Sequence, residues 1–167
     1  MLFSYNLDIF IKGEMMRKII KLLLVIFWMG LIFSFSSDSA DISTKKSDGV
    51  IIKTVELFLD KDLSDKEEEK WISSFVTPVR KGAHFFLYLI LGILIINLCR
   101  EFFVIDKKIV LLSVFLAFLY ACSDEIHQLF VPGRSGQISD VILDTLGSLT
   151  GIMIYKLIYN KFKGEKV

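Results

Sequence analysis

Residues able to do chemistry gather at the ends of long apolar segments in this chain. They are basic, acidic and amide side chains with one tyrosine: Lys81, His84, Tyr88, Asp124, Glu125, Gln128, Arg134, Asp140 and Asp144. Ionisable side chains within or beside a membrane span are costly to desolvate, and they commonly mark a pathway or a binding site. We therefore expect these residues to form one ligand-binding site.

The basic members of this set suit an anionic ligand. Lys81, His84 and Arg134 are able to bind a phosphate or a carboxylate, and Arg134 follows a Pro-Gly turn. A structural alternative is that Lys81 pairs with Asp140 and that Arg134 clamps Glu125 or Asp140 instead of a ligand. Both interpretations stay open from the sequence.

The spacing of these residues predicts which helix faces they share. Lys81, His84 and Tyr88 are three and four residues apart, so they line one face of a helix. Asp140 and Asp144 begin a row that continues into Gly147 and Gly151, and small residues let neighbouring membrane helices approach closely. We expect this row to face inward, with Asp144 about 6 Å deeper than Asp140.

Four apolar segments are long enough to hold the chain in a membrane. The composition is 53% hydrophobic, and the segments are Ile19–Phe35, Lys81–Cys99, Ile109–Phe130 and Ile138–Tyr159. Each approaches the roughly 20 residues that a spanning helix needs. The predicted fold is all-α, a bundle of four transmembrane helices within a single domain over residues 1–167.

The distribution of lysine and arginine predicts the orientation of the bundle. Basic residues precede the first span, fill the short loop after Cys99 and follow the fourth span, whereas the loop between the last two spans holds only Arg134. The positive-inside rule then places both termini in the cytoplasm and the polar residues on the outer side. The net charge of +1 gives no basic surface for nucleic acid.

The segment 36–77 is predicted to be an outer loop with short helices. Val50–Leu59 is apolar enough to lie along a membrane face, and Ser64 with Glu67 has the form of a capping box. Thr77-Pro78 is typical of a helix start, so it predicts that one helix ends there and the next span begins. A disordered linker is the alternative.

The first span carries two further alternatives. Basic residues before a short apolar run, followed by Ser34-Phe35-Ser36, also fit a cleaved signal peptide. Residues 1–15 are a candidate start-site extension, because the codons for Lys12-Gly13-Glu14 can encode a ribosome-binding signal before Met15.

The sequence predicts no metal and no cofactor. A site built from His84, Glu125 and Asp140 is conceivable, but no local ligand spacing supports it. Cys99 and Cys122 fall near opposite ends of neighbouring spans, too far apart for a disulfide.

Three stretches of this chain resemble the VanZ-like family. They are Val79–Tyr88, Ser123–Ser135 and Asp140–Gly147, and the resemblance extends from Met16 onward. It implies a bacterial membrane protein with four spans, and the family is named for a protein linked to resistance to the glycopeptide teicoplanin. It implies no agreed biochemical mechanism.

Three functional hypotheses follow. The first is a non-enzymatic membrane protein whose outward-facing polar pocket binds a cell-envelope precursor or a glycopeptide antibiotic. The second is an enzyme on lipid-linked envelope substrates, with Glu125 or Asp140 as general base and His84 as its partner. The third is a proton-coupled transporter through the Asp144 row, which the apolar inner halves of the spans disfavour.

Overall fold

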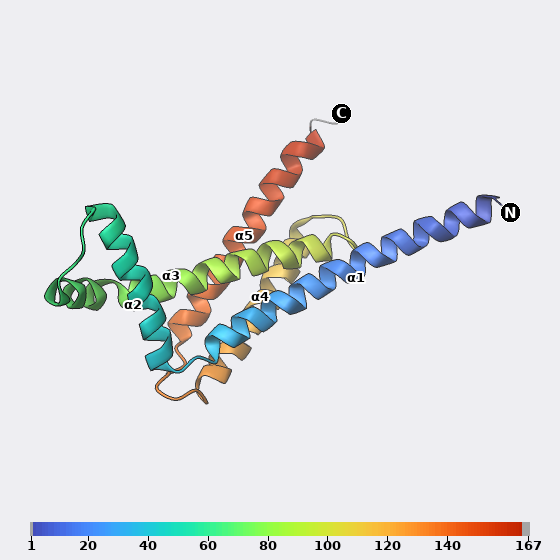
Figure 1. The fold of residues 1–167 in the computed structure, drawn as a ribbon. Helices are drawn as coiled ribbons and strands as arrows, with labels where there is room; N and C mark the ends of the chain where they lie inside the picture. Colours follow the sequence, from blue (N-terminus) through green and yellow to red (C-terminus); the bar gives the residue numbers. More distant parts are fainter. Residues whose placement is uncertain (1, 165–167) are drawn as a thin grey trace.

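The computed structural model describes residues 2–164, which form five α-helices and no strand (Figure 1). The helices are α1 (Leu2–Ser36), α2 (Ala40–Leu59), α3 (Asp65–Cys99), α4 (Lys107–Gln128) and α5 (Ile138–Gly164). Four of them contain a segment long and apolar enough to cross a membrane, namely Lys12–Ser36, Asp65–Cys99, Lys107–Gln128 and Ile138–Phe162. The predicted all-α architecture with four candidate spans is confirmed.

The helix boundaries follow local capping. The carboxylate of Asp106 accepts hydrogen bonds from the backbone N–H groups of Lys108 and Ile109, so α4 begins at Lys107, earlier than predicted. It ends at Gln128, where the chain turns, and not at Phe130. α5 begins at the predicted Ile138.

Close packing of α3 against α5 forms the centre of the bundle. A Cβ atom at Gly92 would overlap the backbone carbonyl of Ser148, and one at Gly151 would overlap that of Leu89. The hydroxyl of Ser148 donates a hydrogen bond of 3.0 Å to the Tyr88 carbonyl. The row of small residues on α5 therefore faces inward, as its spacing predicts.

Helix α1 is integrated into the bundle. The indole of Trp28 donates to the Leu87 carbonyl on α3 at 2.9 Å, and the Tyr120 hydroxyl of α4 donates to the Met29 carbonyl at 2.6 Å. Ile32 is completely buried. These contacts indicate a resident helix of the fold and disfavour the signal-peptide alternative.

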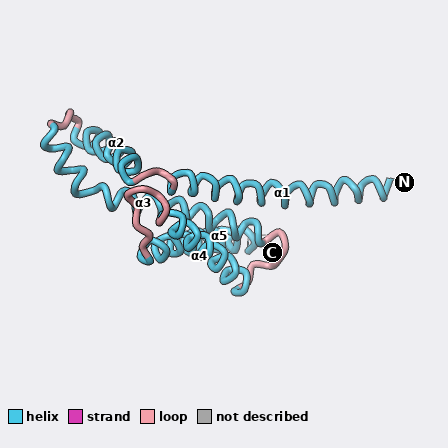
Figure 2. Tube along the Cα trace, turned by 90° about the horizontal axis from the view of Figure 1, so that it is seen from below, coloured by secondary structure: helices cyan, strands magenta, loops and turns pink. Residues whose placement is uncertain are grey.

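The segment between α1 and the bundle part of α3 is helical, which excludes the disordered-linker alternative. Helix α2 ends at Leu59, and its C-cap residue Asp60 adopts a left-handed conformation (φ 49°). The capping box predicted at Ser64 and Glu67 is formed at the start of α3. Helix α2 and the first turns of α3 extend together beyond one end of the bundle (Figures 1 and 2).

The predicted helix break at Thr77-Pro78 is wrong, because Pro78 lies inside the continuous helix α3. A proline inside a helix removes one N–H and crowds the carbonyl four residues earlier. That disturbance is local. The cap at Ser64 stabilises the helix before Pro78, and contacts with the bundle stabilise it after Pro78. The hydroxyl groups of Ser73 and Ser74 both donate to the Lys70 carbonyl at 2.9 Å in the turn before the proline.

Candidate functional site

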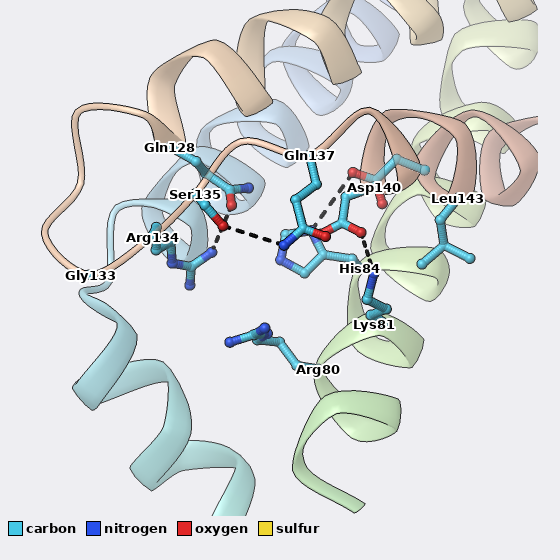
Figure 3. A pocket seen from close by; sticks show the side chains of 11 residues that line it. Arg80, Lys81, His84, Gln128, Gly133, Arg134, Ser135, Gln137, Asp140 and Leu143 are labelled. Atoms are coloured by element: carbon cyan, nitrogen blue, oxygen red, sulfur yellow. Dashed lines mark hydrogen bonds and ion pairs between the residues drawn. The ribbon is translucent and has the colours of Figure 1, made fainter.

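The predicted polar residues meet at one end of the bundle, around a small cavity (Figure 3). Its volume is about 70 Å³, enough for a few water molecules or a small oxyanion group. Helix α3, the end of α4, the α4–α5 loop and the start of α5 provide the lining residues Arg80, Lys81, His84, Gln128, Gly133, Arg134, Ser135, Gln137, Asp140, Leu143 and Asp144. Six of the nine predicted site residues are in that lining.

Lys81 and Asp140 form an ion pair across the cavity wall. The Lys81 Nζ to Asp140 Oδ1 distance is 2.5 Å, and the two side chains are 35% and 24% exposed. The predicted structural pairing is therefore present. Asp140 neutralises Lys81, so Lys81 alone gives the cavity little net positive charge.

Arg134 bonds to neutral acceptors, not to the carboxylates of Glu125 or Asp140 that were expected as its structural partners. Its guanidinium donates to the carbonyls of Asp38 (2.9 Å) and Phe35 (3.3 Å) and to the side-chain oxygen of Gln128 (3.2 Å). Those carbonyls are exposed by the chain leaving α1, which lies beside the α4–α5 loop. Burial, and then the charge of Arg80, lower the pKa of Arg134.

The turn before Arg134 depends on glycine. Gly133 has a φ of 75°, in the left-handed region that favours glycine. This conformation directs the loop so that Arg134 extends toward the cavity (Figure 3).

Arg80 is a cavity residue that the sequence reasoning missed, because its position at the predicted start of a span is typical of an interfacial anchor. Its side chain extends into the space between Arg134 and Lys81 (Figure 3). Among the residues whose side chains are described, 12–39 and 43–162, none forms a hydrogen bond or ion pair with the Arg80 side chain. The signal in the sequence was the spacing of four between Arg80 and His84, which places both on one helix face.

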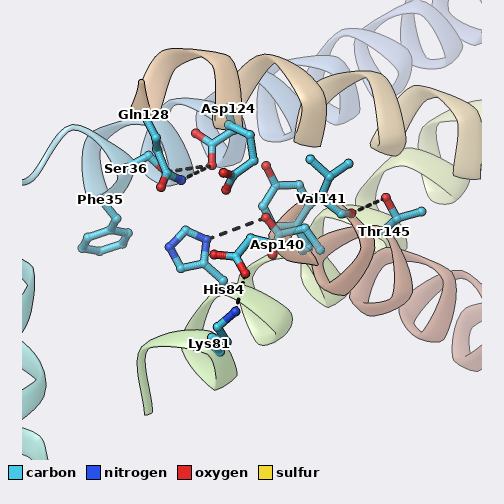
Figure 4. A network of polar contacts seen from close by, with 12 residues as sticks. Phe35, Ser36, Lys81, His84, Asp124, Gln128, Asp140, Val141 and Thr145 are labelled. Carbon is cyan, nitrogen blue, oxygen red and sulfur yellow. Dashed lines mark hydrogen bonds and ion pairs between the residues drawn. The ribbon is translucent and has the colours of Figure 1, made fainter. Parts of the chain in front are cut away.

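Two acids lie at the deep end of the cavity. Asp144 lines its wall, and Asp124 lies behind that wall. Asp144 is completely buried, and its nearest carboxylate oxygen is 3.8 Å from Nδ1 of His84. Asp124 is 2% exposed and accepts hydrogen bonds at one oxygen from Ser36 (2.8 Å) and Gln128 (3.4 Å) (Figure 4). The expected depth difference between Asp140 and Asp144 agrees with their burial.

Tyr88, Glu125 and Asp124 are the predicted site residues that do not line the cavity. Tyr88 is completely buried between helices. One oxygen of Glu125 accepts a hydrogen bond of 2.8 Å from the backbone N–H of Gln137, so this carboxylate anchors the start of α5.

An apolar groove adjoins the polar cavity. Its volume is about 440 Å³, and it runs between α1, α2 and α3. Mostly apolar residues line it, including Trp28, Phe35, Val50, Val79, Phe86, Leu87 and Ile90. Arg80 and His84 line both spaces, so the groove and the cavity share one wall.

Comparison with known families identifies the chain. The model of the VanZ/LLP1 family matches residues 21–159. The chain belongs to the VanZ/LLP1 family. The matched range contains every residue of the cavity and the greater part of each of the four candidate spans, so the expected family membership is confirmed. No curated protein and no solved structure matches this VanZ/LLP1 chain.

Proposed function

We propose that this VanZ/LLP1 protein binds an anionic amphiphile of the bacterial cell envelope, with the charged head in the polar cavity and the apolar chain in the groove. The observation that carries this proposal is the pair of guanidinium groups, Arg80 and Arg134, beside an apolar groove that shares Arg80 and His84 with the cavity. Neither guanidinium is paired with a carboxylate in the described part of the chain.

The two arginine side chains of the cavity favour an anion. Lys81 is neutralised by Asp140, whereas among the described side chains and backbone Arg134 bonds only neutral oxygens and Arg80 bonds none (side chains described: 12–39 and 43–162). Arginine is suited to phosphate and carboxylate because its planar fork offers several donors at once. A phosphate held by both arginines would satisfy donors that the protein leaves unused.

The groove supplies the apolar half of the ligand site. Its volume of about 440 Å³ falls within the range of about 300–1,000 Å³ found for small-molecule pockets. A lipid chain or the acyl part of an antibiotic fits its lining chemically. The positive-inside argument supports cytoplasmic termini and an outward-facing site. Envelope precursors and glycopeptide drugs are encountered on that outer side. Resistance to teicoplanin-type glycopeptides would follow from that contact.

The catalytic alternative finds less support in the geometry. Each proposed general base already has a partner, Asp140 through Lys81 and Glu125 through the backbone of Gln137. The acid next to His84 is Asp144 instead. Binding is therefore the function that we adopt.

Lipid binding by the purified full chain tests the proposal. We expect detergent-solubilised protein to bind fluorescent phosphatidic acid more tightly than fluorescent phosphatidylcholine, which has a neutral head. Arg80→Gln should weaken binding of phosphatidic acid by about 10- to 100-fold, the effect of losing a hydrogen bond to a charged group. Lys70→Gln, the same charge change at an exposed position of α3, should leave binding unchanged.

Two results would contradict the proposal: equal affinity for the two lipids, or equal loss in the Arg80 and Lys70 variants. Drug susceptibility measures the physiological consequence. A deletion strain complemented with Arg80→Gln should stay as sensitive to teicoplanin as the uncomplemented strain, while Lys70→Gln should restore the wild-type level.

A further inference from the structure

Three side chains of types that can ligate a metal lie close together at the deep end of the polar cavity, one from each of three helices. His84 of α3, Asp124 of α4 and Asp144 of α5 each offer one ligand atom, and these atoms lie within 4.8 Å of one another. The set differs from the one conceivable from the sequence, because Asp124 and Asp144 replace Glu125 and Asp140.

The carboxylates of this cluster lack the partners that buried charges require. Asp144 is completely buried, and neither of its oxygens has a hydrogen-bond partner among the described residues. Oδ1 of Asp124 is likewise buried without a partner. Burying a carboxylate is expensive unless it is paired, hydrogen-bonded or bound to a metal, so these three oxygens have the capacity to bind a cation.

The neighbouring basic side chains do not supply that cation. Lys81 is held by Asp140, and Arg134 by the carbonyls of Phe35 and Asp38. His84 is the nearest basic group, but its Nδ1 lies 3.8 Å from Asp144, beyond hydrogen-bond distance.

We propose that His84, Asp124 and Asp144 bind a divalent transition-metal ion, with Zn²⁺ preferred over Mn²⁺. One imidazole nitrogen and two carboxylate oxygens are ligands that suit these ions. In a tetrahedral zinc site the ligand atoms lie about 3.4 Å apart, so binding draws the three side chains slightly together. His84 and Asp144 also line the polar cavity, which gives the ion a route of entry and an open coordination position.

Metal retention by the full-length protein tests this site independently of lipid binding. The protein is purified in detergent with an affinity tag that contains no histidine, stripped with a chelator, loaded with ZnCl₂ or MnCl₂ and desalted. Mass-spectrometric metal analysis should find about one zinc ion per chain, as expected for a single site with three protein ligands. Zinc should also raise the Tm, because it binds the folded state.

Asp144→Asn should weaken zinc affinity by more than about 100-fold and abolish the Tm increase. Glu125→Gln is the matched control, since Glu125 is a buried acid on α4 beside Asp124 that contributes no atom to the cluster. It should retain the metal. Cys122→Ser should retain it as well, which separates this site from zinc binding by the thiol.

Asp124→Asn and His84→Gln provide the same test if Asp144→Asn does not fold. The proposal is overturned if the wild-type protein retains neither ion after loading, or if the cluster variants retain zinc like Glu125→Gln. A third result also overturns the proposal: zinc does not change the Tm of the wild type, and Asp144→Asn has a higher Tm than the wild type. It would show that Asp144 is protonated and binds no metal. None of these outcomes depends on whether Arg80 binds an anion.

Discussion

At the scale of single residues, the basic side chains of the cavity differ in whether they have a carboxylate partner. Lys81 has an acid partner in Asp140, whereas Arg80 and Arg134 have none among the acids whose side chains are described (residues 12–39 and 43–162). Residue type alone does not separate these roles, since all three are basic residues near a span end. The role of each basic residue depends on which acceptor oxygens lie within hydrogen-bond distance of it in the folded chain.

A second polar cluster lies at the opposite end of the bundle, around Glu101. Its carboxylate accepts hydrogen bonds from Lys21 and Arg17 of α1, and its side chain is 6% exposed. Lys21 also donates to the side chain of Asn97 at 3.0 Å. These hydrogen bonds connect α1 to the end of α3.

Glu101 gives a prediction about pH and stability. The hydrogen bond from Lys21, followed by that from Arg17, lowers the pKa of Glu101. Its contribution is therefore present above the ordinary glutamate pKa and is lost as the pH falls below about 4.5, through the folded-state pKa. Glu101→Gln should lower stability at pH 7 by about 1–3 kcal/mol, and the difference from the wild type should shrink in acid.

The measurement is the Tm of the protein in detergent at neutral and acidic pH. Glu14→Gln is the control, because the Glu14–Arg17 pair is 3.8 Å apart and well exposed, and surface pairs contribute little. A Glu101 variant with the wild-type Tm at pH 7 would contradict this account.

At the scale of helices, the α3–α5 contact positions most of the site. Lys81 and His84 on α3 face Asp140 and Asp144 on α5 because small residues allow the two helices to lie close together. Any change that separates these helices should also disperse the cavity.

Two glycines of α3 test this packing. Gly92→Ala places a Cβ against the Ser148 carbonyl and should destabilise the protein by about 1–3 kcal/mol or more. Gly82→Ala meets nothing within 4 Å and should stabilise by up to about 1 kcal/mol through helix propensity. The Tm values should move in opposite directions. A common direction for both variants would argue against close α3–α5 contact at Gly92.

At the scale of the whole molecule, three helices and one loop bring distant residues together. Residues of the cavity come from α3, α4, α5 and the loop before α5, and they lie at the end of the bundle where α1 finishes (Figures 1 and 3). The first turns of α1 and the last turns of α5 extend from the opposite end (Figure 1). A single orientation in the membrane therefore exposes the entire site on one side.

Labelling in intact cells tests the predicted orientation. In a variant without Cys99 and Cys122, a cysteine at Ser135 should react with a membrane-impermeant maleimide, because the predicted orientation places its loop outside. A cysteine at Val104, which is 77% exposed in the loop after α3, should react only after lysis. The reverse pattern would place the cavity in the cytoplasm.

The sequence by itself determined the helical class, the four spans and the family, because hydrophobic length and local spacing are properties of short stretches. It also determined that Gly147 and Gly151 face inward and that the predicted polar residues share one end. The continuity of α3 through Pro78 depended on tertiary contacts, which outweigh a local proline signal.

Only the tertiary structure decided the partners of each polar group. Arg134 finds carbonyls of Phe35 and Asp38 almost a hundred residues earlier in the chain, and Asp144 meets His84 and Asp124 from two other helices. Which side chains meet depends on how the helices are rotated and offset against one another. Spacing within one helix fixes which face a residue occupies, but it does not fix what that face meets.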